Sequence, residues 1–156
     1  MHLTISAAES AVKDVLEARG MTTAAATAWA AVWLEACGYS GITLLAEALG
    51  DERRTLDLTR DALGLDLDNV SCAFLAPAIM RDISANGRAF LRNVRHGLFL
   101  LPFAVKANIG IGCPVDPGFA LGGERHKNPY GEKLALAEAN GLELDDTLWT
   151  NLKDRT

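Results

Sequence analysis

The segment 20–38 constrains the fold most strongly, because it contains a predicted helix that is apolar on every side. Thr22 or Thr23 can cap this helix, which runs to Cys37 and is closed by Gly38. It is rich in alanine, with Trp29 and Trp33 one turn apart and Glu35 as its only charge. Alanine loses little side-chain entropy in a helix, and a helix that is apolar all round is buried. We therefore predict that this helix lies at the centre of the domain or in a subunit interface. A ligand-stacking platform built from the two tryptophans is the less favoured alternative.

Short turns that contain glycine separate the expected N-terminal helices. A capping box that begins at Ser6 predicts the start of the first helix, and Gly20 predicts its end. Ser40 is the expected N-cap of a third, shorter helix that ends before Gly50. Helices joined by such short connections pack as neighbours, so residues 4–50 are expected to form a helical part.

Two stretches in the second half of the chain predict strands. Leucines alternate with acidic residues over 63–68, which is the period of a short strand. The run 98–105 is short, apolar and rich in large side chains, and Pro102 places it at a sheet edge or a bulge. Residues 88–95 fit either a helix or a strand with two different faces.

Helix signals alternate with these strand signals. Pro77 suits the first position of a helix that ends near Asn86. Residues 55–62 fit a helical turn, and residues 132–140 fit a helix that is closed by Gly141.

The chain length favours a single domain over residues 1–156, because about 150 residues are typical of one domain. We expect an α+β fold in which an N-terminal helical subdomain packs on a small mixed sheet with one or two further helices. The helical part spans 4–50, and the mixed part spans 63–156.

The charge balance argues against a nucleic-acid partner. The chain has 15 basic and 20 acidic residues and a net charge of −5, whereas binding to phosphates requires a basic surface. Five basic residues and one acidic residue lie between Arg81 and Lys106. This local excess is a candidate for contact with an anion or a phosphate, and a solvated surface is the more favoured interpretation.

Four residues are candidates for binding a small anionic ligand. Arg92, Arg95 and His96 fall within the basic stretch, and His126 lies in a polar turn further along the chain. Either histidine can act as a general acid or base, although a histidine among charged residues more often belongs to the solvated surface. The sequence assigns no catalytic residue.

The remaining motifs predict neither a metal nor a cofactor. The cysteines at 37, 72 and 113 form no CxxC pair, and prolines interrupt the glycine-rich stretch 110–118 where a nucleotide-binding helix would begin. An odd number of cysteines without a secretory signal indicates reduced thiols, so we expect a cytoplasmic protein. No apolar run is long enough to cross a membrane, so we expect no membrane partner.

Several apolar stretches resemble an uncharacterised bacterial family. They are the tryptophan- and glycine-containing stretch 33–45, the Leu-Leu-Pro-Phe sequence at 100–103 and the late segment 141–149. The resemblance covers most of the chain. Members of that family continue beyond the position of Thr156, so it implies a chain that is truncated at its C-terminus, and it implies no particular reaction.

The N-terminal helices are also faintly similar to those of the type-2 malate/lactate dehydrogenase family. In that family the helices lead into a Gly-x-x-Ser-His-Gly element whose histidine is catalytic. The corresponding Gly38-Tyr-Ser-Gly41 has no histidine after Ser40, so the similarity assigns no catalytic residue here.

The sequence favours a non-catalytic or small-ligand-binding protein that works as a homo-oligomer, a dimer being the expected form. The apolar segment 20–38 motivates this prediction, because no catalytic motif accompanies it. The alternative is a small cytosolic enzyme, or an enzyme subunit, that acts on an anionic metabolite through the four candidate residues. Convergence of those side chains in one cleft would favour the enzyme.

Overall fold

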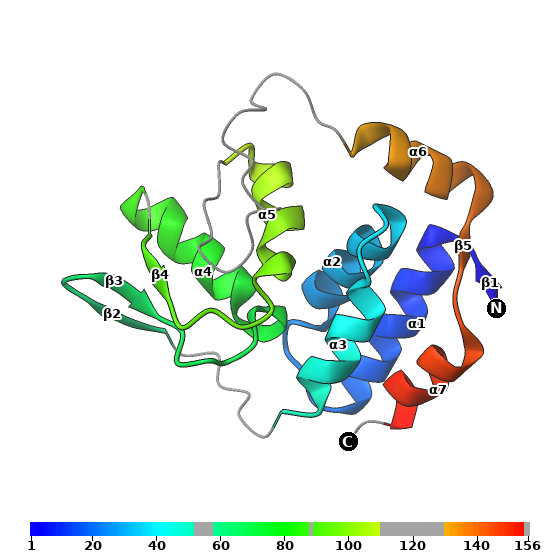
Figure 1. Ribbon diagram of the computed structural model, residues 1–156, viewed down its shortest axis with the longest axis horizontal. Helices are drawn as coiled ribbons and strands as arrows, with labels where there is room; N and C mark the ends of the chain where they lie inside the picture. Colours follow the sequence, from blue (N-terminus) through cyan, green and yellow to red (C-terminus); the bar gives the residue numbers. More distant parts are fainter. Residues whose placement is uncertain (52–57, 88, 110–129, 155–156) are drawn as a thin grey trace. The chain divides into compact units, whose positions relative to one another are not determined.

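The chain folds into two compact units. The computed structural model describes residues 1–51, 58–87, 89–109 and 130–154 (Figure 1). Residues 1–50 and 128–156 form one unit, here called the helical unit, and residues 51–127 form the other, the sheet unit. The described residues form seven α-helices and two small sheets, which confirms the predicted α+β class. The chain from residue 128 onward, expected with the mixed part, belongs to the helical unit.

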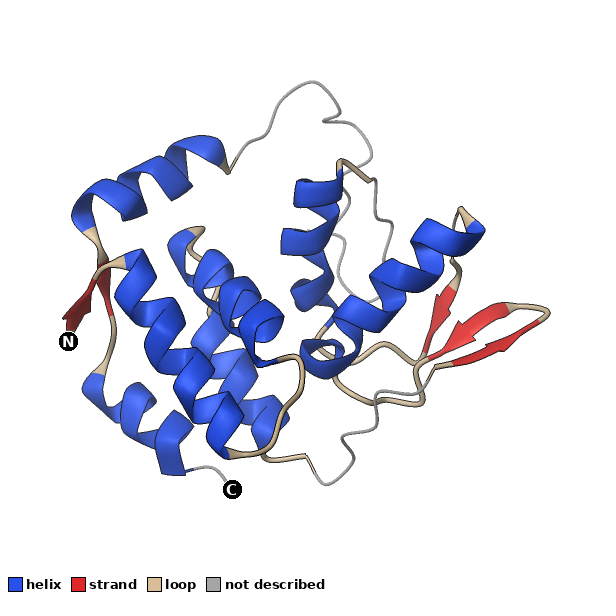
Figure 2. Ribbon diagram, turned by 180° about the vertical axis from the view of Figure 1, so that it is seen from behind, coloured by secondary structure: helices blue, strands red, loops and turns tan. Residues whose placement is uncertain are grey.

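Helix α2 forms the centre of the helical unit and is largely buried. It contacts α1, α3 and α6, and α7 contacts α3. The unit also contains a two-stranded antiparallel sheet, which Figure 2 shows in red beside its helices. Its helices are α1 (Ile5–Ala18), α2 (Ala24–Ala36), α3 (Gly41–Leu49), α6 (Gly131–Asn140) and α7 (Asp146–Asp154), and its strands are β1 (His2–Leu3) and β5 (Leu142–Glu143). Burial within its own unit therefore accounts for the apolar composition of α2.

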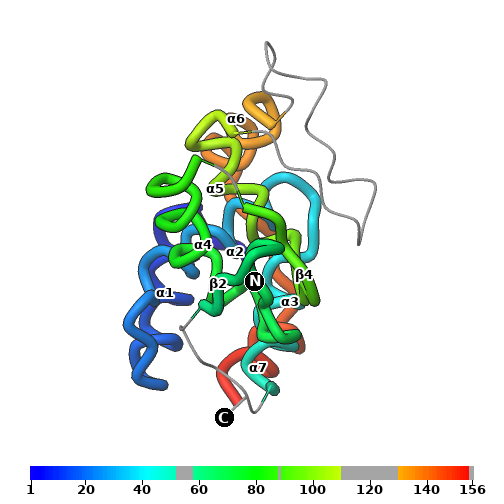
Figure 3. The backbone as a smooth tube through the Cα atoms, turned by 90° about the vertical axis from the view of Figure 1, so that its left-hand side faces the viewer, coloured from blue at the N-terminus to red at the C-terminus, as the bar shows by residue number. Residues whose placement is uncertain are grey.

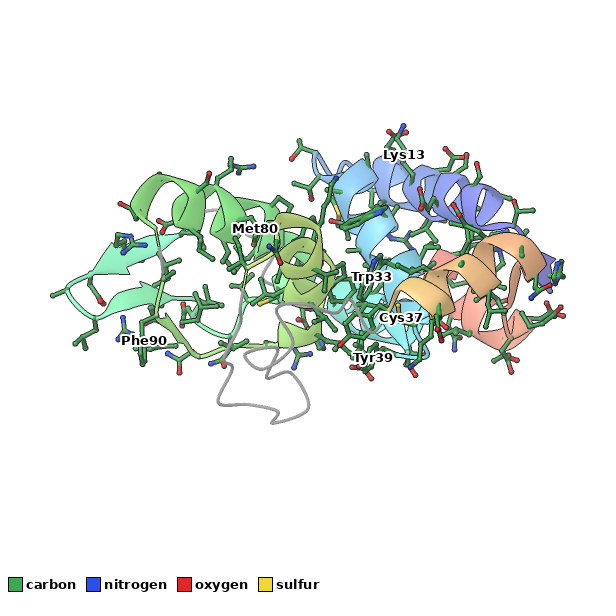
Figure 4. All side chains as sticks on the ribbon, turned by 90° about the horizontal axis from the view of Figure 1, so that it is seen from above. Lys13, Trp33, Cys37, Tyr39, Met80 and Phe90 are labelled. Atoms are coloured by element: carbon green, nitrogen blue, oxygen red, sulfur yellow. The ribbon has the colours of Figure 1, made fainter. Side chains whose placement is uncertain are left out.

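Helix α6 covers the C-terminal end of α2. The rings of Trp33 and Tyr130 lie 5.0 Å apart between centroids, and Lys133 Nζ donates a hydrogen bond to the Cys37 carbonyl oxygen at 3.3 Å. The positive charge stabilises this helix end, where the peptide dipoles leave a partial negative charge. Trp33, labelled with Cys37 in Figure 4, is thus packed inside the helical unit. As predicted, α6 ends at Gly141.

The structure corrects the predicted start of α1. The Thr4 hydroxyl accepts a hydrogen bond from the Ala7 amide at 3.1 Å, and the helix begins at Ile5. Thr4 has the extended backbone of an N-cap, whereas Ser6 is already helical. The capping box predicted at Ser6 is therefore wrong.

A side chain of α2 caps α3. Ser40 precedes α3 as predicted, but its hydroxyl makes no capping hydrogen bond. The Ile42 amide instead donates to Glu35 Oε1 at 2.9 Å. Burial raises the pKa of Glu35 above its usual value, and the hydrogen bond from Ile42 offsets part of that increase. Glu35, the only charged residue of α2, thus stabilises the turn between α2 and α3.

This arrangement predicts an unusual pH dependence. Because the pKa of Glu35 is raised by folding, the folded chain retains the proton when the unfolded chain has lost it, and stability falls as pH rises through that interval. The advantage of Glu35→Gln over the wild type in melting temperature should therefore increase from pH 4 to pH 7. Glu35→Ala lacks the acceptor for Ile42 and should be about 1 kcal/mol less stable than Glu35→Gln at either pH. A constant difference between Glu35→Gln and the wild type would contradict the prediction.

The sheet unit contains a three-stranded sheet with one antiparallel and one parallel strand pair. Strand β3 (Gly64–Asp66) is antiparallel to β2 (Thr59–Asp61) and parallel to β4 (Leu91–Arg92). Helix α4 (Cys72–Asn86) lies between the two parallel strands in the chain; Figure 3 labels α4, β2 and β4 on the backbone tube. After β4 come a 3₁₀ turn and α5 (Leu100–Ala107). The strand predicted over 63–68 is therefore confirmed, and the open interpretation of 88–95 resolves to a strand.

Three other predictions for this unit are wrong. Residues 98–105 lie in the 3₁₀ turn and α5 instead of a strand. The helix tolerates Pro102 because this residue lies in the first helical turn, where no amide donor is required. Pro77 lies inside α4, which begins five residues earlier behind its cap Ser71. The helical turn expected over 55–62 is strand β2 at 59–61, and 52–57 lie outside the described residues. In the described ranges, no helix is both long and apolar enough to cross a membrane.

Candidate functional site

Two loops in the sheet unit lie side by side because they follow the parallel strands β3 and β4. We call residues 67–71 and 93–96 the paired loops. The Asn69 amide donates to the Asn93 carbonyl oxygen at 3.0 Å, and the Cys72 amide donates to the Arg95 carbonyl oxygen at 2.9 Å. Ligands commonly bind at this end of parallel strands.

The paired loops contain strained backbone. Five non-glycine residues in the described part of the chain have a positive φ, and four of them lie in these loops: Asp68, Asn69, Asn93 and His96. Such conformations cost about 1–3 kcal/mol each and cluster where local geometry matters. Three of the predicted site residues lie in or beside these loops, so this is the candidate site.

Arg95 is held by a carboxylate of its own unit. Its Nε and Nη2 donate to the two carboxylate oxygens of Asp51 at 2.8 and 2.9 Å. A bidentate pair of this kind fixes the guanidinium plane as well as neutralising its charge. An anionic ligand at Arg95 would have to compete with Asp51.

Arg92 is also paired. Its guanidinium donates to Asp61, which links β4 to β2 across the sheet. The pKa of Asp61 lies below its usual value, chiefly because its carboxylate accepts the Leu63 amide and also because Arg92 is adjacent. The Asn93 side chain likewise donates to Asp66 at 2.8 Å and lowers the pKa of that carboxyl.

His96 is bonded to the cap of α4. Its Nδ1 lies 2.7 Å from the Ser71 hydroxyl oxygen, which also accepts a hydrogen bond from the Ala73 amide at 3.1 Å. A serine next to a histidine is the arrangement of a nucleophile and its base. Ser71, however, is fully buried, so its hydroxyl is not accessible to a substrate. The bond instead ties the loop after β4 to the start of α4.

Three of the four predicted site residues lie in or beside the paired loops. Arg92, Arg95 and His96 lie within one short stretch, and each is bonded to a different partner in the sheet unit. His126 lies outside the described residues. The sequence reasoning missed the partners Asp51, Asp61 and Ser71. Only Ser71 had a local signal, because a serine before an apolar helical run is typical of an N-cap.

The described residues include no group of His, Cys, Asp and Glu side chains that could hold a metal ion. Cys37 and Cys72 are both buried. Burial raises the pKa of the Cys37 thiol to about 11, so the reactive thiolate is scarce at neutral pH. The described thiols therefore suit packing better than chemistry.

Two large apolar side chains are exposed at the end of the sheet unit. Leu63 lies in the turn between β2 and β3 and is 68% exposed, and Phe90 precedes β4 and is 76% exposed. The chain positions adjoin, because the Leu65 amide donates to the Phe90 carbonyl oxygen at 2.8 Å and a Cβ on Gly64 would lie 2.8 Å from that of Phe90. We call Leu63 and Phe90 the apolar tip; Phe90 is labelled in Figure 4.

No known protein family, curated protein or solved structure matches the chain. The resemblances to the bacterial family and to the dehydrogenase family therefore stay predictions.

Proposed function

We propose that the protein is a non-catalytic or small-ligand-binding protein that works as a homo-oligomer. The observation that carries this proposal is the pairing of the predicted cluster: Arg92 and Arg95 bind carboxylates, and His96 binds a buried hydroxyl. The Arg92 pair links strands β4 and β2, and the bonds of Arg95 and His96 hold the loop after β4. The apolar tip supports the homo-oligomer, because large apolar side chains that are exposed in the single chain occur at interaction sites.

A second candidate is a small enzyme that acts on an anionic metabolite. The adjacency of Arg92, Arg95 and His96 in one stretch favours it. A substrate carboxylate or phosphate would then displace Asp51 from Arg95 and take over its bidentate hydrogen bonds. The two functions therefore differ in what Arg95 binds.

Arg95→Met tests this difference in a thermal-shift assay with phosphorylated and carboxylated metabolites. We expect no metabolite to stabilise the wild type, and we expect Arg95→Met to lower stability by up to about 1 kcal/mol, since the pair is partly exposed. Asp51→Asn should have a similar effect, and the double variant should cost little more than either single variant.

The matched control is Arg81→Met, because Arg81 is an exposed arginine of the same unit. A metabolite that stabilises the wild type and Arg81→Met, but not Arg95→Met, would show that Arg95 binds a small anionic ligand. Turnover of that metabolite by the wild type would then overturn the non-catalytic proposal in favour of the enzyme. Light scattering tests the homo-oligomer separately. A strict monomer up to millimolar concentration would contradict it.

A further inference from the structure

The same three residues, Ala-Asn-Gly, stand at the ends of two helices. They occupy 85–87 at the end of α4 and 139–141 at the end of α6. We propose that Asn86 is a site of spontaneous deamidation in the folded protein, that Asn140 is protected, and that the modified chain has a less stable end of α4. This inference goes beyond the proposed function and does not depend on it.

An asparagine that precedes glycine can lose its side-chain amide without an enzyme, because glycine has no Cβ to hinder the approach of its own nitrogen. The Gly87 nitrogen loses its proton and forms a bond to Cγ of Asn86. The bond between Cγ and Nδ2 breaks, and ammonia leaves. One water molecule then opens the cyclic imide at either of its carbonyl carbons, so the product at position 86 is an aspartate or an isoaspartate.

In both turns a hydrogen bond holds the attacking nitrogen. The Gly87 amide donates to the Ile83 carbonyl oxygen at 2.7 Å, and the Gly141 amide donates to the Ala137 carbonyl oxygen at 2.8 Å. The reaction therefore requires that the last turn of the helix opens first. Helix ends open at a much lower free energy than a protein core does. The rate at each site thus depends on what else holds its glycine.

Gly141 is held by more than its own helix. Strand β5 begins at the next residue and pairs with β1, and a Cβ on Gly141 would lie 2.7 Å from the Leu3 carbonyl oxygen. At Gly87, by contrast, a Cβ would meet no atom within 4 Å, and residues 84–87 are all exposed. Opening at Gly87 breaks bonds in the last turn of α4, whereas opening at Gly141 also disturbs the pairing of β5 with β1.

The new carboxylate weakens the end of α4. In the unmodified chain Nδ2 of Asn86 donates a hydrogen bond to the Asp82 carbonyl oxygen at 3.1 Å. A carboxylate cannot donate this bond, and it adds negative charge where the peptide dipoles already leave a partial negative charge. Asp82 lies four residues earlier and pairs with Arg60 of β2, and like charges at this spacing repel each other. Deamidation therefore destabilises the turn beside the ion pair that ties α4 to β2.

Peptide mass analysis of the full chain, aged at pH 8 below its melting temperature, tests the inference. Trypsin separates the two asparagines into different peptides, because it cleaves after Arg81, Arg88, Lys133 and Lys153. We expect Asn86 to deamidate at least about tenfold faster than Asn140 in the folded protein. In guanidinium chloride the two rates should be similar, because the local sequence is the same.

Hydrogen exchange measures the opening of the two turns directly. The Gly87 amide should exchange at least about tenfold faster than the Gly141 amide, although their hydrogen bonds are of similar length. Equal deamidation rates in the folded protein, a faster reaction at Asn140, or deamidation that is confined to the unfolded chain would each overturn the inference.

Asn86→Asp reproduces one of the two products and tests the effect on stability. It should lower the melting temperature by about 2–4 °C. Asn86→Gln is the matched control, because glutamine keeps an amide donor and closes the cyclic imide far more slowly. This variant should retain the melting temperature and abolish the mass change in the peptide 82–88. If Asn86→Asp is as stable as Asn86→Gln, the proposed weakening of α4 is wrong.

Discussion

Gly41→Ala should destabilise the protein by about 3 kcal/mol and lower its melting temperature by roughly 10 °C. Gly41 is the first residue of α3 and packs directly on the backbone of α2. A Cβ at this position would collide with the Ala31 carbonyl oxygen and lie 2.7 Å from the Cβ of Leu34. Neither group belongs to a flexible side-chain end, so the two helices would have to move apart. Thermal and chemical unfolding measure the loss.

Gly131→Ala provides a matched control, because Gly131 is the first residue of α6 and a Cβ there would meet no atom within 4 Å. This variant should be neutral or more stable by about 0.5 kcal/mol, since alanine restricts the unfolded chain. Equal effects of the two substitutions would show that the close approach of α2 and α3 contributes nothing to stability.

Ser71→Ala should destabilise the sheet unit by about 2–3 kcal/mol. The substitution removes the N-cap of α4, which contributes about 1 kcal/mol, and leaves the buried side of His96 without its hydrogen bond, which costs about 1–2 kcal/mol more. His96→Ala should cost less, and the double variant should show a coupling of about 1 kcal/mol. Chemical unfolding of the four proteins measures that coupling.

Thr4→Ala is a control that measures the loss of a helix N-cap without the loss of a hydrogen bond to a histidine. The Thr4 hydroxyl also accepts a hydrogen bond from a backbone amide, that of Ala7, at 3.1 Å at the start of a helix. Thr4 is exposed, and this bond involves no histidine. This control should lose only about 1 kcal/mol. If Ser71→Ala costs no more than Thr4→Ala, the Ser71–His96 bond does not stabilise the paired loops.

Helices α1, α2, α3 and α6 could be predicted from the sequence because their signals are local, whereas α7 was not predicted. Closing glycines act within one turn, and the apolar pattern of α2 is typical of a buried helix. Residues 98–105 were misassigned for the opposite reason. A short apolar run suits a buried strand and a buried helix equally well, and only tertiary packing decides between them.

Three of the predicted site residues lie at the paired loops, but their hydrogen-bond partners were not predicted from the sequence. A count of charges along the chain showed an excess of arginine between residues 81 and 106. It could not show that Asp51 lies opposite Arg95, because 44 residues separate the two in sequence. Ion pairs of this kind are fixed by the fold, so a local excess of charge in the sequence need not persist in the folded unit.

The helical unit is discontinuous in sequence, and this has a consequence for the order of folding. The chain leaves the unit after residue 50 and returns at residue 128. Helices α6 and α7 therefore join α1–α3 only after the whole sheet unit has been synthesised. Bringing the two ends of such a long connection together costs chain entropy. If part of the connection has already folded, the remaining flexible chain is shorter and this cost is smaller. A sheet unit that folds early would thus accelerate completion of the helical unit, so substitutions in one unit would change the folding rate of the other.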